Sequence, residues 1–259
     1  MTDDLPLARR DLIAGRLAAG QAVVSGLLAV EFGVSEDAVR RDLRALAADG
    51  RCRRVYGGAL PPTPATAPMT ARMGEGQGRK AALARAAAAT IRPGEFLFLD
   101  AGSTNLALVE VLPEEAGLTI ATNSVDIAAA LLRRGDVTLI VIGGAVNPLV
   151  GGAVDAEAVA AVLRMNVDRL FLGACAVSAR DGISAFDHAD AAFKRALCAV
   201  SRERIVLATS DKLEARAPHR VAPLVDISCL VVEADASAAA VADLRSNGVS
   251  VVVAEEGNA

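Results

Sequence analysis

The sequence predicts an α/β protein in two parts, an N-terminal winged helix-turn-helix followed by a mostly parallel-sheet α/β domain. Three observations lead to this fold class. Helical periodicity with start and stop signals fills residues 1–59, and prolines and glycines crowd residues 60–78. From residue 79 to 259, β-rich runs alternate with helical patterns, as in parallel sheets that are covered on both faces. We therefore expect a helical unit at 1–59, an extended proline-rich linker at 60–78 and the α/β domain at 79–259.

Start and stop signals place three short helices in the first unit. Apolar residues at helical spacing predict a first helix that Gly20 ends. Ser25 can cap a very short second helix that runs to about Phe32, and Gly33 breaks the chain after it. Ser35 predicts the start of a third helix, because its hydroxyl can accept a hydrogen bond from a free backbone N–H of the first turn. The apolar side of this third helix faces the core, which leaves a basic cluster on the opposite side: Arg40, Arg41 and Arg44.

Basic residues are concentrated near this third helix, although the whole chain carries a net charge of −4. Residues 40–54 contain six arginines and two aspartates. On charge alone, a phosphate-binding surface and a solvated helix face explain this excess equally well. The layout of helix, glycine turn and helix favours DNA binding, because it places the second helix in the major groove, and residues 51–58 can form a small β wing in which Tyr56 packs. The residues expected to contact DNA are Ser35, Arg40, Arg41, Arg44, Arg53 and Arg54.

Two runs in this unit carry a family resemblance: residues 32–43, Phe-Gly-Val-Ser-Glu-Asp-Ala-Val-Arg-Arg-Asp-Leu, and residues 54–59, Arg-Val-Tyr-Gly-Gly-Ala. Together with Gly50 between them, they resemble the winged helix-turn-helix of the DeoR family of bacterial transcription regulators. The resemblance covers about the first 60 residues of the chain. It implies that a double-stranded DNA operator is the partner, that the chain forms a dimer or a higher homo-oligomer, and that repression is the usual outcome.

Seven strands and six helices alternate in the second part of the chain. Strands are expected at residues 96–100, 118–122, 137–142, 169–172, 205–209, 228–233 and 249–254. Helices are expected at residues 80–90, 106–112, 125–134, 156–165, 189–201 and 236–246.

Polar residues follow three of these strands, at the ends where ligands bind in parallel sheets. The first strand is followed by residues 100–105, Asp-Ala-Gly-Ser-Thr-Asn, just before a helix. Glycine allows a tight turn there, and backbone N–H groups with the hydroxyls of Ser103 and Thr104 suit a phosphate. Thr-Asn-Ser follows the second strand at 122–124, and Gly-Gly follows the third at 143–144. Taken singly, each of these runs is more often a helix cap or a turn.

In this order the three runs resemble the effector domain of the same DeoR family, whose fold is shared with ribose-5-phosphate isomerase. The resemblance extends from residue 79 to residue 233, with Asp190 where the family usually has Glu. It implies that one group of residues surrounds the phosphate of a phosphorylated sugar: Ser103, Thr104, Asn123, Gly144 and Lys212. Asp100 and Lys194 would lie nearer the sugar hydroxyls. Without the resemblance, both lysines would be interpreted as solvated surface charges.

These observations predict a DNA-binding transcriptional regulator of carbohydrate-metabolism genes, a repressor controlled by a phosphorylated sugar or a related metabolite. It is not expected to be an enzyme and has no expected catalytic residue. The alternative is an enzyme resembling a sugar-phosphate isomerase, in which Asp100, Asp190 and Lys194 would supply a carboxylate base and a lysine near the carbonyl. The attached winged helix favours the regulator.

Overall fold

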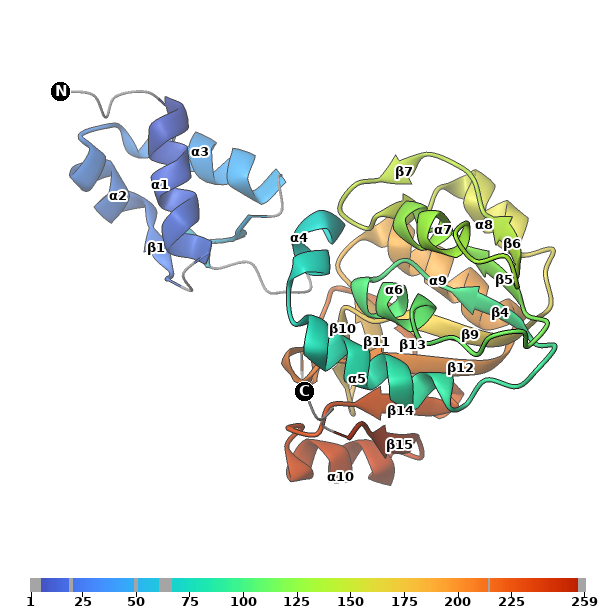
Figure 1. Cartoon of the computed structure of the whole chain (residues 1–259). Helices are drawn as coiled ribbons and strands as arrows, with labels where there is room; N and C mark the ends of the chain where they lie inside the picture. Colours follow the sequence, from blue (N-terminus) through green and yellow to red (C-terminus); the bar gives the residue numbers. More distant parts are fainter. Residues whose placement is uncertain (1–5, 19–20, 49–50, 61–66, 214, 256–259) are drawn as a thin grey trace. The chain divides into compact units, whose positions relative to one another are not determined.

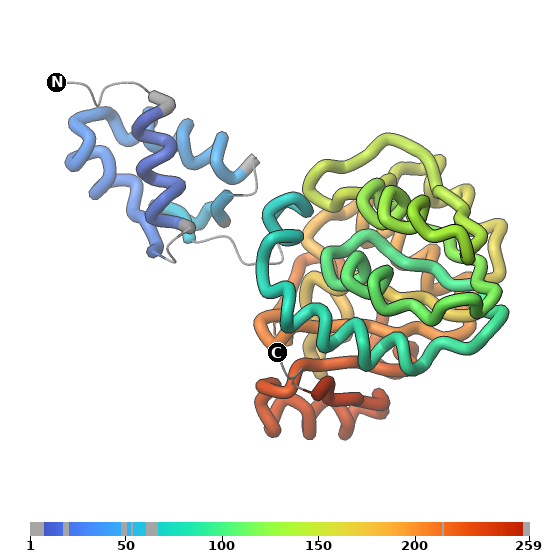
Figure 2. The backbone as a smooth tube through the Cα atoms, viewed as in Figure 1, coloured from blue at the N-terminus to red at the C-terminus, as the bar shows by residue number. Residues whose placement is uncertain are grey.

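The computed structural model describes residues 6–18, 21–48, 51–60, 67–213 and 215–255. The chain divides into two compact units, residues 1–68 and residues 69–259. Figure 1 labels the helices and most of the strands, and Figure 2 traces the backbone.

The first unit is the predicted winged helix-turn-helix (Figure 1). Its elements are α1 (Pro6–Ala18), β1 (Val23–Val24), α2 (Ser25–Phe32), α3 (Glu36–Ala48), β2 (Arg53–Val55) and β3 (Gly58–Leu60). The three strands form an antiparallel sheet in the order β1-β3-β2, so the expected wing is present. Gly33 ends α2 in the left-handed region, with φ of +63°, where a residue with a Cβ is disfavoured. Apolar side chains of the three helices, Ile13, Leu17, Leu28, Val39 and Leu43 among them, pack into one core.

The second unit is built on a parallel sheet of seven strands in the order β15-β14-β12-β9-β4-β5-β6. In chain order the strands are β4 (Phe96–Leu99), β5 (Thr119–Thr122), β6 (Thr138–Val141), β9 (Val167–Gly173), β12 (Ser201–Ala208), β14 (Cys229–Val232) and β15 (Ser250–Val253). Each overlaps a predicted strand. The sequence did not indicate the two small additions, an antiparallel sheet of β10 (Ala176–Ser178), β11 (Gly182–Ala185) and β13 (His219–Ala222), and a ribbon of β7 (Val146–Asn147) and β8 (Gly152–Ala153).

Helices cover both faces of this sheet (Figure 1). One hydrophobic core packs α5 (Gln77–Ala88), α6 (Ser103–Val109) and α7 (Val125–Leu131) on one face. The other core packs α8 (Ala156–Val162), α9 (His188–Val200) and α10 (Ala238–Ser246) on the opposite face. The predicted fold class, a helix-turn-helix followed by a parallel-sheet α/β domain, is thus confirmed.

The chain changes direction across the sheet between β4 and β9, which are neighbours at its centre. From β4 the chain passes through α6 to β5 on one side, whereas from β9 it passes through α9 to β12 on the other side. The two connections therefore leave the carboxyl ends of β4 and β9 in opposite directions. Such a switch point is where parallel α/β sheets bind ligands.

The prediction of an extended linker at residues 60–78 is wrong for residues 69–78. Helix α4 (Met69–Gly74) and the start of α5 occupy that stretch, and the Met69 side chain is buried. The four prolines all precede α4, and Gly76 adopts a left-handed φ of +58° between the two helices. The glycines therefore mark a turn between helices, where an extended spacer was expected. Residues 61–66 lie outside the described residues.

Limited proteolysis with elastase, which cleaves after small residues, is expected to cut first between Leu60 and Met69. Leu60 ends the hydrogen-bonded wing and Met69 is buried at the start of α4, so the preferred bonds lie between the two units. Mass spectrometry of the early fragments checks the site of cleavage. A first cut inside residues 96–233 would contradict the division.

Candidate DNA-binding face and ligand site

Helix α3 presents its arginines on one exposed face, as the sequence predicts. Arg40, Arg41 and Arg44 are all exposed. Arg40 forms an ion pair with Glu36 one turn earlier, at 2.8 Å, and Arg44 Nε donates to the Arg40 carbonyl at 3.3 Å. At the start of the helix, the Ser35 hydroxyl accepts a hydrogen bond from the Ala38 amide at 3.3 Å, which confirms the expected N-cap.

Asp42, in the middle of this arginine run, does not share the exposed face. Its side chain is buried and accepts a hydrogen bond from Arg9 Nε of α1 at 2.7 Å. Arg10 adds a longer ion pair at 3.5 Å. Asp42 therefore connects α1 to α3, and its negative charge does not offset the arginines of the exposed face.

The wing adds a further exposed cation. Arg54 of β2 is exposed, whereas the side chain of Arg53 lies outside the described part of the chain. The expectation that Tyr56 packs within the wing is wrong, because its side chain is fully exposed. Tyr56 occupies the tight turn between paired Val55 and Gly58, so its ring points away from the three strands.

At the switch point of the second unit, a lysine joins two buried carboxylates. The Asp100 side chain follows β4 and is fully buried, and its Oδ2 accepts from the Gly173 amide at 2.8 Å. Lys194 Nζ of α9 donates to Asp100 Oδ2 at 2.7 Å and to Asp190 Oδ1 at 2.6 Å. Lys194 is only 2% exposed, so the interpretation of this residue as a solvated lysine is wrong.

In this ion triad of Asp100, Asp190 and Lys194, the surroundings shift the pKa of Asp100 and of Lys194. Burial raises the pKa of the Asp100 carboxyl, and the Lys194 ammonium only partly opposes that shift. Burial disfavours the charged form of Lys194, but the two carboxylates outweigh it and raise the pKa of Lys194. The charged form of Lys194 is therefore favoured in this site, and its two hydrogen bonds hold the carboxylates in place.

Two hydroxyls lie beside the triad in the first turn of α6. Ser103 and Thr104 are both buried, and no side chain caps this turn. The neighbouring Asn105 amide donates from Nδ2 to the carbonyls of Asp100 and Phe171, both at 2.8 Å, and so ties the ends of β4 and β9 together. Thr104 Oγ1 and Asp100 Oδ1 are buried with no protein partner. Because buried polar atoms are nearly always hydrogen-bonded, these two atoms indicate a ligand or solvent position.

Asn123 and Gly144 make structural contacts in the neighbouring loops. Asn123 Oδ1 accepts from the Ala101 amide at 3.1 Å, and its Nδ2 donates to the Ala153 carbonyl at 3.0 Å. Gly144 is exposed with φ of +140°, and a Cβ there would approach an Asp155 carboxylate oxygen to 2.6 Å. The Asn123 amide therefore holds the loop after β4 to β8, and glycine at 144 makes room for Asp155.

The last of the predicted ligand-binding residues is Lys212, which lies in the short turn Ser210–Lys212 after β12. Its side chain is half-buried. Burial lowers the pKa of its ammonium, and the guanidinium of Arg72 lowers it further. Sequence reasoning missed Arg72 as a neighbour because it placed this residue in the linker. Helix α4 has only six residues, too few for a helical period to show.

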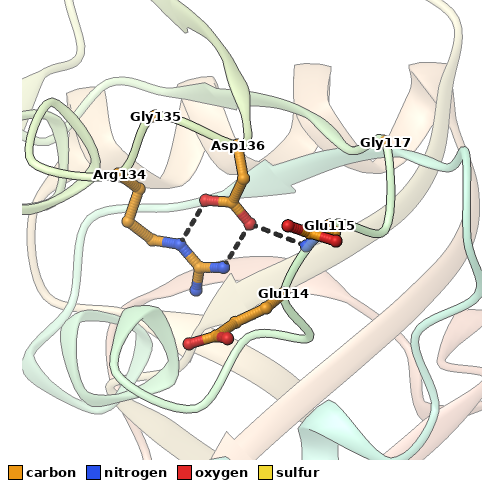
Figure 3. A pocket seen from close by; sticks show the side chains of 6 residues that line it. All are labelled: Glu114, Glu115, Gly117, Arg134, Gly135 and Asp136. Carbon is orange, nitrogen blue, oxygen red and sulfur yellow. Dashed lines mark hydrogen bonds and ion pairs between the residues drawn. The ribbon is translucent and has the colours of Figure 1, made fainter.

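A surface hollow lies at the opposite edge of the sheet, next to the amino ends of β5 and β6 (Figure 3). Arg134 already forms two hydrogen bonds to Asp136 there, at 2.9 and 2.6 Å. The hydrogen bond from Arg134 lowers the pKa of Asp136 to about 2. The other charged residues of the hollow are Glu114 and Glu115, so it offers no unpaired cation to an anionic ligand.

The part of the chain that the structure describes contains neither a cluster of metal-binding side chains nor a helix that could span a membrane. No group of three or more histidine, cysteine, aspartate or glutamate side chains in this part could hold a metal ion. None of the helices that the structure describes is both long and apolar enough to cross a bilayer.

Two protein-family models match the chain. The model described as the DeoR-like helix-turn-helix domain matches residues 9–64, and the model described as the DeoR C terminal sensor domain matches residues 75–234. The first match covers the unit that carries α3 and the wing, and the second covers the switch point with its triad.

Curated relatives match over most of the chain. The HTH-type transcriptional regulator YgbI of Escherichia coli strain K12 is 31% identical over 257 residues, 97% of this chain and 99% of that protein. The transcriptional repressor AccR of Agrobacterium fabrum is 30% identical, over 82% of this chain and 84% of that protein. The glycerol-3-phosphate regulon repressor of E. coli K12 is 29% identical, over 71% of this chain and 74% of its own. Among solved structures, ribose 5-phosphate isomerase A from Neisseria gonorrhoeae is 14% identical, with a TM-score of 0.38 over 52% of this chain and 53% of that chain.

Proposed function

Since the chain belongs to the DeoR family of transcriptional regulators, we propose that it is a repressor that releases or binds operator DNA in response to a phosphorylated sugar or a related phosphorylated metabolite. The family consists of regulators, which decides against the isomerase alternative: the chain is not an enzyme. Two relatives are named as repressors, and one of these is named for a glycerol-3-phosphate regulon. The genes it controls are accordingly proposed to serve carbohydrate metabolism.

The DNA contacts are proposed for the exposed face of the first unit. Arg40, Arg41 and Arg44 would enter the major groove on α3, and Ser35 would contact the backbone near the start of that helix. Arg53 and Arg54 of the wing would bind phosphates. A homo-oligomer follows from the same proposal, because helix-turn-helix proteins usually bind symmetric half-sites with two copies. In bacteria the DNA, and hence this regulator, would be in the cytoplasm.

The ligand is proposed to bind at the switch point of the second unit. The observation that carries this proposal is the pair of buried, unpartnered atoms at the carboxyl end of β4, Thr104 Oγ1 and Asp100 Oδ1. A hydroxyl donor suits a phosphate oxygen and a carboxylate acceptor suits a sugar hydroxyl. Ser103 and Lys212 would join Thr104 around the phosphate, and Lys194 would hold Asp100 toward the sugar. Asn123 and Gly144 would shape the loops around them.

A thermal-shift screen over phosphorylated pentoses, hexoses, ketoses and sugar acids tests the proposed ligand class. At 100 times its dissociation constant, a ligand of this class stabilises the second unit by about 2.7 kcal/mol, whereas the unphosphorylated sugar does far less. Lys212→Ala, or Ser103→Ala with Thr104→Ala, should reduce the shift and leave the ligand-free melting temperature nearly unchanged. Equal shifts from phosphorylated and unphosphorylated sugars would rule out the proposed site.

A further inference from the structure

Two cationic side chains, Arg72 of α4 and Lys80 of α5, lie in the segment that precedes the first strand of the sheet. Arg72 of α4 donates from Nη2 to the carbonyls of Leu149 and Val150, at 3.1 and 3.3 Å. The Lys80 ammonium of α5 donates in turn to the main-chain carbonyl of Arg72. Lys80 is buried, and Arg72 is half-buried. The contacts hold Arg72 against the loop between β7 and β8.

The position of α4 is fixed by a second contact. Met69, at the start of the helix, is 1% exposed, and a Cβ added to Gly151 would approach its Cγ to 2.6 Å. Gly151 also has φ of +81°, so both the packing and the backbone require glycine there. Helix α4 therefore rests on the β7–β8 loop of the second unit, with Arg72 one turn after this anchor.

Three unpartnered buried atoms lie on α4, on α6 and at the end of β4, and α4 packs against α6. The described residues contain four buried side-chain nitrogen or oxygen atoms without a hydrogen-bond partner, and three of them are Arg72 Nε, Thr104 Oγ1 and Asp100 Oδ1. The β7–β8 segment that holds Arg72 also packs against the loop after β4, because a Cβ added to Gly152 would approach the Ala101 Cβ to 3.0 Å. The carboxylates of Asp190 and Asp100 partly oppose the lowering of the Arg72 pKa by burial. Two donors and one carboxylate acceptor form the set that a phosphorylated polyol needs.

The charges at this place favour an anion. The buried or half-buried ionic side chains include four cations, Arg72, Lys80, Lys194 and Lys212, and four carboxylates, Asp100, Asp126, Asp187 and Asp190. Lys194 is bonded to both Asp100 and Asp190, whereas no ion pair of Arg72 or Lys212 occurs among the described residues. These two cations without an ion pair match a phosphate monoester, which carries nearly two negative charges at neutral pH.

We propose that Arg72 is a ligand-binding residue of the sensor and donates its Nε–H to the phosphate of the effector. The proposal rests on the proposed function and extends its site to a residue that lies in neither matched family segment, 9–64 or 75–234. Arg72 belongs to α4, the first helix of the second unit, so ligand binding at Arg72 would involve the helix of that unit that is nearest in sequence to the DNA-binding unit. The guanidinium suits this role, since its fixed donors match phosphate geometry.

Titration of the full-length protein with inorganic phosphate tests the role of Arg72, with chloride at matched ionic strength as the reference. The melting temperature, measured at increasing phosphate concentration, gives the affinity of the protein for phosphate. We expect Arg72→Gln to lower the phosphate affinity at least tenfold and Arg72→Lys, which keeps the charge but not the fixed donors, to lower it less. Arg85→Gln removes an exposed arginine of α5 and should leave the affinity unchanged. In NMR spectra, the side-chain Nε–H signal that is absent in Arg72→Lys should shift when phosphate is added to the wild type.

The phosphate titration distinguishes a failure of the Arg72 proposal from a failure of the proposed function. If Arg72 only holds the β7–β8 loop, both Arg72 variants would melt at lower temperature without phosphate, their phosphate affinity would equal that of the wild type, and the Nε–H signal would not move. If Lys212→Ala loses phosphate affinity at the same time, that result rules out the role of Arg72 in binding phosphate but still supports the proposed ligand site. If neither inorganic phosphate nor any phosphorylated sugar stabilises the wild type, the proposed function fails as well.

Discussion

Replacing Arg40 and Arg44 together by alanine is expected to weaken operator binding by at least about 2 kcal/mol, roughly thirtyfold, because each arginine that contacts a base contributes about 1–3 kcal/mol. Both side chains are exposed on α3, beside Arg41 and away from the core of the first unit. The operator for this measurement is selected from random duplexes by the wild-type protein, and affinity is measured by fluorescence anisotropy at several salt concentrations. Each phosphate contact that is lost should also lower the log–log salt slope by about 0.9.

Arg85→Ala provides the control for net charge, because Arg85 is an exposed arginine of α5 in the second unit. It should leave both the affinity and the salt slope unchanged. Unchanged operator affinity in the Arg40→Ala, Arg44→Ala double variant would show that α3 is not the helix that binds the bases. Equal losses in the double variant and in Arg85→Ala would show that only overall charge matters.

Much of the first unit could be predicted because its signals are local. Ser35 caps the amide of Ala38 three residues later, and the arginines repeat at helical spacing on one face. Asp42 could not be assigned in the same way. Its partner Arg9 lies 33 residues earlier, so only the folded chain shows that this carboxylate is buried between α1 and α3. Tyr56 was misjudged because a tight turn exposes a ring whatever its hydrophobicity.

The position of the proposed ligand site in the sheet could be predicted from the sequence, whereas most of its side-chain contacts could not. The carboxyl ends of parallel strands meet at one edge of the sheet, so the runs after β4 and β5 were expected to converge. The ion pair between Asp100 and Lys194 joins residues 94 positions apart, and only the family resemblance indicated that Lys194 faces the site. Arg72 carried no signal, because it follows four prolines and lies in a helix of six residues.

Lys194→Met is expected to lower the stability of the second unit by about 3 kcal/mol or more at pH 8, because removal of one partner leaves buried charges uncompensated. In this variant Asp100 and Asp190 face each other without the ammonium that bonds to both. Burial and repulsion by the Asp190 carboxylate would hold the pKa of the Asp100 carboxyl above that of the unfolded chain, about 3.9. The folded variant then binds protons that the unfolded chain has released, so the loss of stability grows as the pH rises from 5 to 8.

Denaturant unfolding at pH 5, 6, 7 and 8 measures this dependence against the wild type. Arg195→Met changes the next residue of α9, which is exposed, and should cost little at any pH. Adding Asp190→Asn to Lys194→Met removes one of the two facing carboxylates, so the double variant should be more stable at pH 8 than Lys194→Met alone. Only uncompensated carboxylates can produce both the pH dependence and the rescue by Asp190→Asn. If Lys194→Met lowers stability equally at every pH and Asp190→Asn does not restore it, Lys194 contributes through packing alone.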